Sequence, residues 1–145
     1  MTDLTHAAAQ AIVAATLKYA AEHQLNPLGV VVLDARGASR ALAAQDGTSL
    51  KRADVAHAKA YGALSMGMGS RSLAKRAKDH PHFVTAVGQT LGGAMIPVAG
   101  GVLIRDAGGR LQGAVGVSGD TSDNDEAAAL AGIAAAGLTG DPGSD

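Results

Sequence analysis

Two short turns of the same type constrain the fold of this chain more than any other feature of its sequence. Asp34-Ala35-Arg36-Gly37 and Asp106-Ala107-Gly108-Gly109 are rich in aspartate and glycine, the residues that favour tight turns. Each turn separates two runs of strand-forming residues, and strands joined in this way pair antiparallel. The two turns begin 72 residues apart, but the flanking helices do not match, so we interpret them as ordinary hairpin chemistry and not as a repeat. The runs are 28–33 and 38–45 around the first turn, and 96–105 and 111–118 around the second.

Helical patterns surround these hairpins. Apolar residues recur at three- and four-residue steps, and capping residues mark several of the expected ends. The sequence therefore predicts one helix, a hairpin, a long and a shorter helix, three strands and a last helix, which is the α+β class. A length of 145 residues predicts one domain over 1–138, followed by a polar, flexible tail over 139–145. The helices are expected at 5–23, at 50–68, after Ser70, and from 122 to 137.

The composition excludes several classes of partner and compartment. There are 12 basic and 13 acidic residues, no tryptophan and one phenylalanine, which disfavours nucleic-acid binding. The chain has no cysteine, so disulfides and thiolate chemistry are excluded. Its first residues lack the positive and apolar regions of a signal peptide, which predicts a cytoplasmic protein. Alanine and glycine supply 52 of the 145 residues, so we expect helices and strands to approach closely through small side chains.

A stretch of 25 residues, 80–104, contains no Asp, Glu, Lys or Arg. Its length would suffice for a membrane span, but two prolines, five glycines and several polar residues argue against a membrane helix. We interpret it as a loop that runs into a buried strand. Such a glycine-rich segment also allows the backbone to approach a flat ligand closely.

Histidines are the side chains of this chain that ligate a metal or haem strongly. His57 lies on an otherwise apolar stripe of the expected helix 50–68, so its imidazole is either a ligand-binding group or a hydrogen-bonded core or interface group. His82 belongs to His80-Pro81-His82, which either presents two imidazoles together or is an exposed loop. The stripe consists of Leu50, Ala53, His57, Tyr61, Leu64 and Met68.

Apolar side chains near these histidines complete a candidate slot for a flat ligand. We expect His57 or His82 to be the axial ligand if the slot binds haem, and we identify no catalytic residue and no separate metal site. The acidic residues Asp120, Asp123, Asp125 and Glu126 lack calcium-loop spacing and are interpreted as capping the last helix. The candidate ligand-binding residues are His57, Tyr61, His82, Phe83, Met95 and Pro97.

Several motifs taken together resemble the GlcG/HbpS-like family of haem-binding or haem-degrading domains. The resemblance covers residues 5–138 and is most specific in the strand 113–119, which is followed by an acidic helix start. The motifs are Val30-Val31-Val32-Leu33-Asp34 with Gly37, Asp46-Gly47, Lys59-Ala60, Ile96-Pro97-Val98-Ala99-Gly100-Gly101-Val102, Gly113-Ala114-Val115-Gly116-Val117-Ser118-Gly119 and Asp125-Glu126.

The resemblance implies a profilin-like α+β fold with a central five-stranded antiparallel sheet and flanking helices in the order α-β2-α2-β3-α. It also implies self-association into dimers or larger rings. Some members of the family bind haem, and others are neighbours of oxidoreductases in catabolic and antibiotic gene clusters. No shared set of catalytic residues comes with the resemblance.

Two functional hypotheses follow. The first is a non-enzymatic, cytoplasmic accessory protein that binds a planar apolar ligand, either haem or a polycyclic aromatic metabolite such as an antibiotic pathway product. This protein would form homo-oligomers and have an oxidoreductase as its candidate partner. The alternative is an enzyme, or an enzyme accessory, that acts in slow oxidative haem breakdown or assists a partner oxygenase.

Overall fold

The computed structural model of the chain describes residues 3–145 and contains a five-stranded antiparallel sheet. Met1 and Thr2, at the start of the expected domain 1–138, lie outside the described residues. Along the chain the elements are α1 (His6–Glu22), β1 (Gly29–Asp34), β2 (Ser39–Ala44), α2 (Arg52–Met66), α3 (Ser70–Asp79), α4 (Pro81–Thr90), β3 (Gly101–Arg105), β4 (Leu111–Ser118), α5 (Ser122–Ala135) and β5 (Thr139–Asp141).

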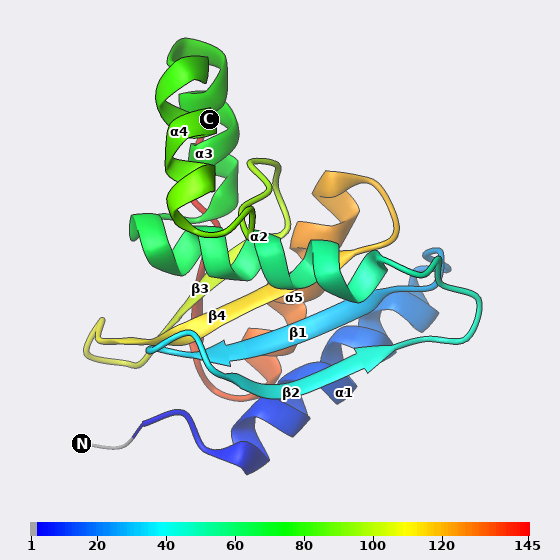
Figure 1. Ribbon diagram of the computed structural model, residues 1–145. Helices are drawn as coiled ribbons and strands as arrows, with labels where there is room; N and C mark the ends of the chain where they lie inside the picture. The colour runs from blue at the N-terminus through cyan, green and yellow to red at the C-terminus, as the bar shows by residue number, and fades with distance from the viewer. Residues whose placement is uncertain (1–2) are drawn as a thin grey trace.

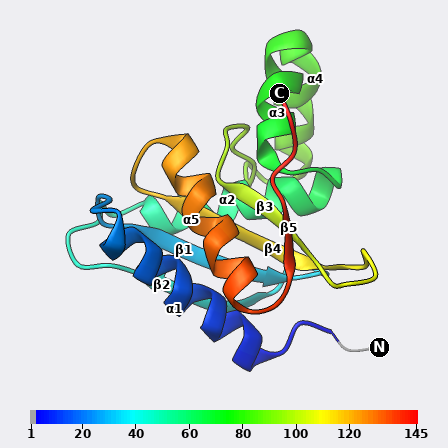
Figure 2. The same ribbon diagram turned by 180° about the vertical axis from the view of Figure 1, so that it is seen from behind.

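The helices cover the two faces of the sheet unequally. The strand order is β2-β1-β4-β3-β5, so the two hairpins join through β1 and β4 at the centre. Helix α2 crosses one face, and α1 and α5 cover the other (Figures 1 and 2). Helices α3 and α4 form a helical hairpin that projects from the α2 side of the molecule (Figure 1). Within residues 3–145, no helix is long and apolar enough to span a bilayer.

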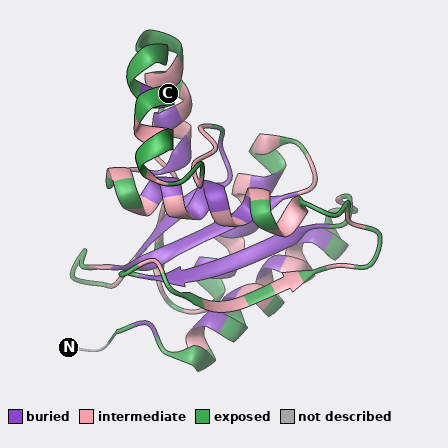
Figure 3. Cartoon of the chain, viewed as in Figure 1, coloured by how far each residue is buried: buried purple, intermediate pink, exposed green. Residues whose placement is uncertain are grey.

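Strand β1 is buried on both faces, which explains the unbroken apolar sequence from Gly29 to Leu33. Val30 and Val32 belong to the core cluster beneath α1 and α5, whereas Val31 and Leu33 belong to the cluster beneath α2. Successive side chains of a strand point to opposite faces, so a two-sided core requires apolar residues at every position. Figure 3 shows the central strands buried, while much of α4 is exposed.

The expectation of close contact through small residues holds where α2 crosses the sheet. Gly116 of β4 lies so near α2 that a Cβ on this residue would overlap the carbonyl oxygen of Ala56. A Cβ on Gly101 of β3 would likewise overlap the carbonyl oxygen of Lys59. Glycine at these two positions lets the helix backbone rest directly on the strand backbone.

The predicted fold class, an α+β fold with a five-stranded antiparallel sheet, is confirmed, but the predicted order of elements is wrong in two places. The first is the charge-free stretch, where residues 81–90 form helix α4 instead of a loop. Pro81 begins this helix, and proline is well tolerated there because the first-turn N–H groups have no helical partner. The prediction had treated this proline as a helix breaker.

The second difference concerns the last strand. The order α-β2-α2-β3-α places three strands before the last helix, whereas β5 follows α5 and lies in the segment 139–145 that was expected to be a flexible tail. β5 is the edge strand of the sheet and pairs with β3, with Ile104 opposite Gly140. A segment of three residues is too short to show a strand pattern in the sequence, so β5 forms only through its pairing with β3.

The strand predicted at 96–105 is also shorter than expected. β3 begins only at Gly101, and the residues before it form an irregular segment that crosses above α2. Pro97 lacks the N–H group that sheet pairing requires. Gly100 has a φ of 122°, whereas strand residues have negative φ, so the strand cannot begin before Gly101. This irregular segment, 91–100, forms one wall of the candidate site.

Candidate functional site

A cavity of about 610 Å³ lies between the α3–α4 hairpin and the segment 91–100. One side of α4 faces it, because residues three and four apart share a helix face. None of the lining residues carries a charge, which follows from the charge-free stretch that supplies most of them. We call this cavity the apolar pocket. It is lined by Ala77, Pro81, Val84, Thr85, Gly88, Gln89, Gly92, Gly93, Met95 and Pro97.

A second cavity of about 400 Å³ adjoins the apolar pocket above the first half of α2. Gly92 and Gly93 line both cavities, so these two glycines form their common border. Both have positive φ angles, and both have open space where a Cβ would lie. We call this second cavity the polar compartment. It is lined by Lys51, Asp54, Val55, His57, Ala58, Gly92, Gly93, Ala94 and Ile96.

The structure brings three of the six candidate residues to this pair of cavities and places Tyr61 beside one of them. Met95 and Pro97 line the apolar pocket, and His57 lines the polar compartment. Tyr61 stacks on His57, with 5.5 Å between the ring centroids and 15° between the ring planes. Met95 also packs against Gly62 of α2, which ties the segment 91–100 to this helix.

The stripe of α2 that contains His57 is only partly buried, although Tyr61 and Leu64 of this stripe pack against the core cluster beneath α2. Ala56, Ala60 and Ala63 form the buried face, whereas Leu50 is 91% exposed and His57 is only half-buried. Because the strand glycines let α2 lie directly on the sheet, the gap between helix and strands has room only for small side chains such as alanine. Because this stripe is only partly buried, the His57 side chain reaches the polar compartment.

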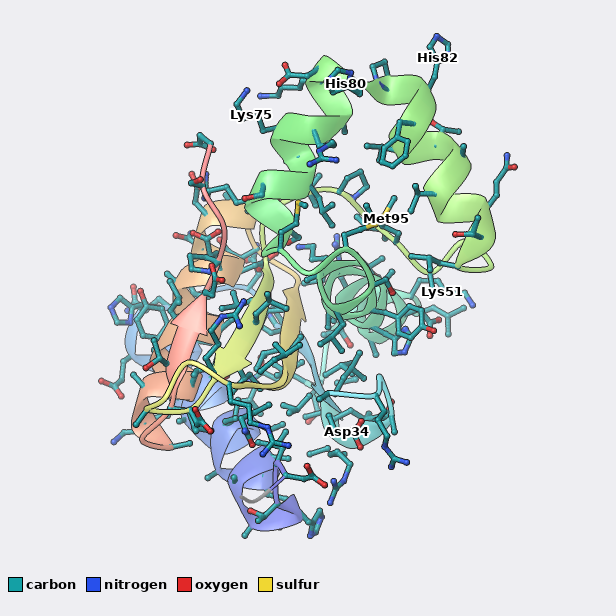
Figure 4. All side chains as sticks on the ribbon, turned by 90° about the vertical axis from the view of Figure 1, so that its left-hand side faces the viewer. Asp34, Lys51, Lys75, His80, His82 and Met95 are labelled. Carbon is teal, nitrogen blue, oxygen red and sulfur yellow. The ribbon has the colours of Figure 1, made fainter. Side chains whose placement is uncertain are left out.

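His82 and Phe83 lie on α4 but are absent from the described lining of both cavities. In Figure 4, His82 lies at the tip of the α3–α4 hairpin and points away from Met95, which lies between α2 and the hairpin. Phe83 is 48% exposed. Their helix begins at Pro81, while His80 before it has the non-helical angles φ −138° and ψ 64°.

Sequence reasoning missed a buried ion pair that anchors the base of the site. Lys59 of α2 lies 3.1 Å from the carboxylate of Asp125 on α5, and its Nζ donates to the carbonyl oxygen of Val117. Burial lowers the pKa of Lys59, while the adjacent Asp125 opposes that shift. The same ammonium group lies against Gly100, the last residue of the segment 91–100. The pair therefore holds α2, α5 and this segment at one point.

Asp125 does more than the helix capping that its sequence context predicted. Thr121 is the N-cap of α5, and the second oxygen of Asp125 accepts a hydrogen bond from the backbone N–H of Asp120. This role becomes visible only in the folded structure, where Asp125 pairs with Lys59 from a distant part of the chain. Both residues stand in the motifs quoted above, but nothing in the sequence joins them.

A family model described as a haem-degrading protein, HbpS-like, matches residues 4–134 of this sequence. The chain belongs to the HbpS-like family. The matched region runs from the second described residue, Leu4, to one residue before the end of α5, so it includes both cavities and excludes β5. The resemblance to the GlcG/HbpS-like family is thereby confirmed.

Solved structures share this HbpS-like fold. HbpS has 28% sequence identity to the chain and a TM-score of 0.78, over 92% of this chain and 90% of that one. The Klebsiella pneumoniae protein ORFY has 25% identity and a TM-score of 0.83, over 94% and 93% of the two chains. PduOC in complex with haem has 23% identity and a TM-score of 0.83, over 94% and 97%, which shows a shared fold. No curated protein matches the sequence significantly.

Proposed function

We propose that this protein binds haem, without catalysing its breakdown, in the apolar pocket and the adjoining polar compartment. One observation carries the proposal: the uncharged apolar pocket adjoins a compartment that contains the imidazole of His57. Gly92 and Gly93 form the border between the two cavities. Membership of the HbpS-like family and the haem complex of PduOC support the choice of haem as the ligand.

The apolar pocket fits the body of a flat, largely apolar molecule. Its volume of about 610 Å³ lies within the range of roughly 300–1,000 Å³ that is typical of small-molecule sites. Met95 is a flexible, polarisable side chain that adapts to a ring surface, while Pro97 supplies a rigid apolar one. The open space beside Gly92 and Gly93 allows the ligand to approach the backbone.

His57 is the residue we assign to the haem iron. Stacking on Tyr61 holds its imidazole beside the polar compartment. A neutral imidazole with a free ring nitrogen is the usual protein ligand of haem iron. His82 is the alternative axial ligand and requires the ligand to reach the tip of the hairpin. Bound haem would supply redox and gas-binding chemistry at its iron.

We assign the protein an accessory role because the titratable side chains in the described lining are Lys51, Asp54 and His57, and Lys51 and Asp54 pair with each other instead of with the imidazole. A polycyclic aromatic metabolite would use the same apolar pocket without a metal ligand. Self-association, a cytoplasmic location and an oxidoreductase partner stay predictions from the sequence.

Hemin titration followed at the Soret band tests whether the apolar pocket is the binding site. Thr85 lines the pocket from an exposed position of α4, so Thr85→Trp should fill the pocket and weaken binding by about tenfold or more. Ala86→Trp is the matched control, because Ala86 is exposed on the same helix and does not line the pocket. Equal affinities of the two variants would refute this location.

A second comparison identifies the iron ligand and the fate of the haem. His57→Ala should abolish the Soret shift, whereas His82→Ala and the control His6→Ala on α1 should retain it. With reductant and oxygen present, a Soret band that persists supports a ligand-holding role. Steady loss of that band would replace this role with enzymatic haem breakdown.

A further inference from the structure

We infer that the ligand of this site is an acid, and that Lys51 binds its carboxylate in the polar compartment. The inference rests on the proposed function, since it concerns the same ligand. It adds a recognition element at the end of the site opposite to the α3–α4 hairpin. Figure 4 shows Lys51 below the segment that follows α4.

The distribution of charge over the two cavities separates an apolar end from a polar end. The described lining of the apolar pocket has no charged side chain, so an anionic substituent placed there would lose hydration without a compensating partner. The polar compartment contains one ammonium group, that of Lys51, and one carboxylate, that of Asp54. A ligand with an apolar body and an acidic edge is therefore accommodated in one orientation.

The position of Lys51 relative to His57 suits such a ligand. The two residues are six positions apart at the start of α2, which corresponds to about 9 Å along a helix axis. A tetrapyrrole whose iron meets one residue would present its carboxylates at a comparable distance from the ring centre. The spacing thus lets a single molecule contact both side chains.

Lys51 is free to exchange its present partner. Its ammonium group lies 3.3 Å from the carboxylate of Asp54, and the two side chains are 76% and 70% exposed. An ion pair this exposed contributes little to stability, so a ligand carboxylate would replace Asp54 at small cost. Lys51 is the N-cap of α2 but makes no capping hydrogen bond through its side chain. Its substitution should therefore leave the helix intact.

Comparison of hemin with its dimethyl ester tests the inference, because the ester keeps the ring and iron and removes both negative charges. The wild-type protein should bind hemin about two- to fivefold more tightly than the ester, as expected for an exposed ion pair. Lys51→Gln should abolish this preference, and Asp54→Asn should increase it. Lys18→Gln, an exposed control on α1 at the far face of the sheet, should leave it unchanged.

The outcomes separate this inference from the proposed function. Failure of both porphyrins to bind would overturn the proposed function itself. Equal binding of hemin and its ester, or a preference that survives Lys51→Gln, would overturn the role of Lys51 while haem binding stands. Loss of the preference at high salt in the wild-type protein, with ester binding unchanged, would support the ion pair.

Discussion

Lys59 and Asp125 are 66 residues apart in the chain and form a buried ion pair at 3.1 Å, with both side chains almost completely excluded from solvent. Each side chain also makes one hydrogen bond to a backbone group, Lys59 to the carbonyl of Val117 and Asp125 from the N–H of Asp120. Within the described chain, no buried polar side-chain atom lacks a partner. The pair joins α2 to the start of α5 and to the end of β4.

Removal of one partner of this pair should be strongly destabilising. Lys59→Met leaves the carboxylate of Asp125 buried without its counter-charge, and we expect the free energy of unfolding to fall by about 3–5 kcal/mol. Urea denaturation measures this loss. The control Lys75→Met breaks an exposed pair with Asp79 and should leave stability almost unchanged, because solvent screens such a pair. A Lys59→Met variant as stable as the control would show that the pair is dispensable.

Asp34 should make stability depend on pH in the acid range. Burial by itself raises the pKa of Asp34, but the N–H groups of Ala38 and Arg36 and the nearby guanidinium groups outweigh burial and hold the pKa below its usual range. A carboxyl group with a lowered folded-state pKa stabilises the protein above its unfolded-state pKa, and this contribution is lost as the pH falls through the folded-state value.

Asp34→Asn should therefore lower the free energy of unfolding by about 1–2 kcal/mol at neutral pH, and the difference from wild type should shrink below about pH 4. Urea denaturation at a series of pH values measures both quantities. A difference that stays constant from neutral to acid pH would contradict the assigned role of the ionised carboxylate.

The glycines beneath α2 should tolerate no side chain. Gly116→Ala forces its new Cβ against the carbonyl of Ala56, and we expect a loss of about 1–3 kcal/mol in thermal or urea denaturation. Gly88→Ala is the matched control, because its Cβ would lie 3.7 Å from Met95 Cε, an ordinary contact. As an alanine inside helix α4 it should stabilise the protein by about 0.5–1 kcal/mol. Opposite signs for the two variants are the expected result.

The hairpins and β1 were predictable because their signals are local. A turn containing Asp and Gly between two strand segments specifies antiparallel pairing within a few residues, and the first five of the six buried residues of β1, Gly29 to Leu33, are a continuous apolar run. Helix α4 was missed because proline and glycine were weighted as breakers, although proline is accommodated in its first turn. β5 was missed because three residues have no pattern of their own.

The site was predictable only in part for the same reason. The charge-free segment pointed to Met95 and Pro97, and an otherwise apolar helical stripe pointed to His57. The sequence did not predict that Gly92 and Gly93 separate two cavities or that Lys51 lies beside them. Both facts follow from the path of the segment 91–100 above α2.

Short-range patterns in the amino-acid sequence thus specify the antiparallel hairpins, most helices, the small-residue contacts and the family, because turn propensity and hydrophobic periodicity act over a few residues. The fold in three dimensions decides which alanine face of α2 is buried, which distant residues form the Lys59–Asp125 pair, and where the cavities lie. These features depend on the relative placement of whole elements, which is determined by backbone approach and desolvation across the folded chain and has no counterpart in local sequence.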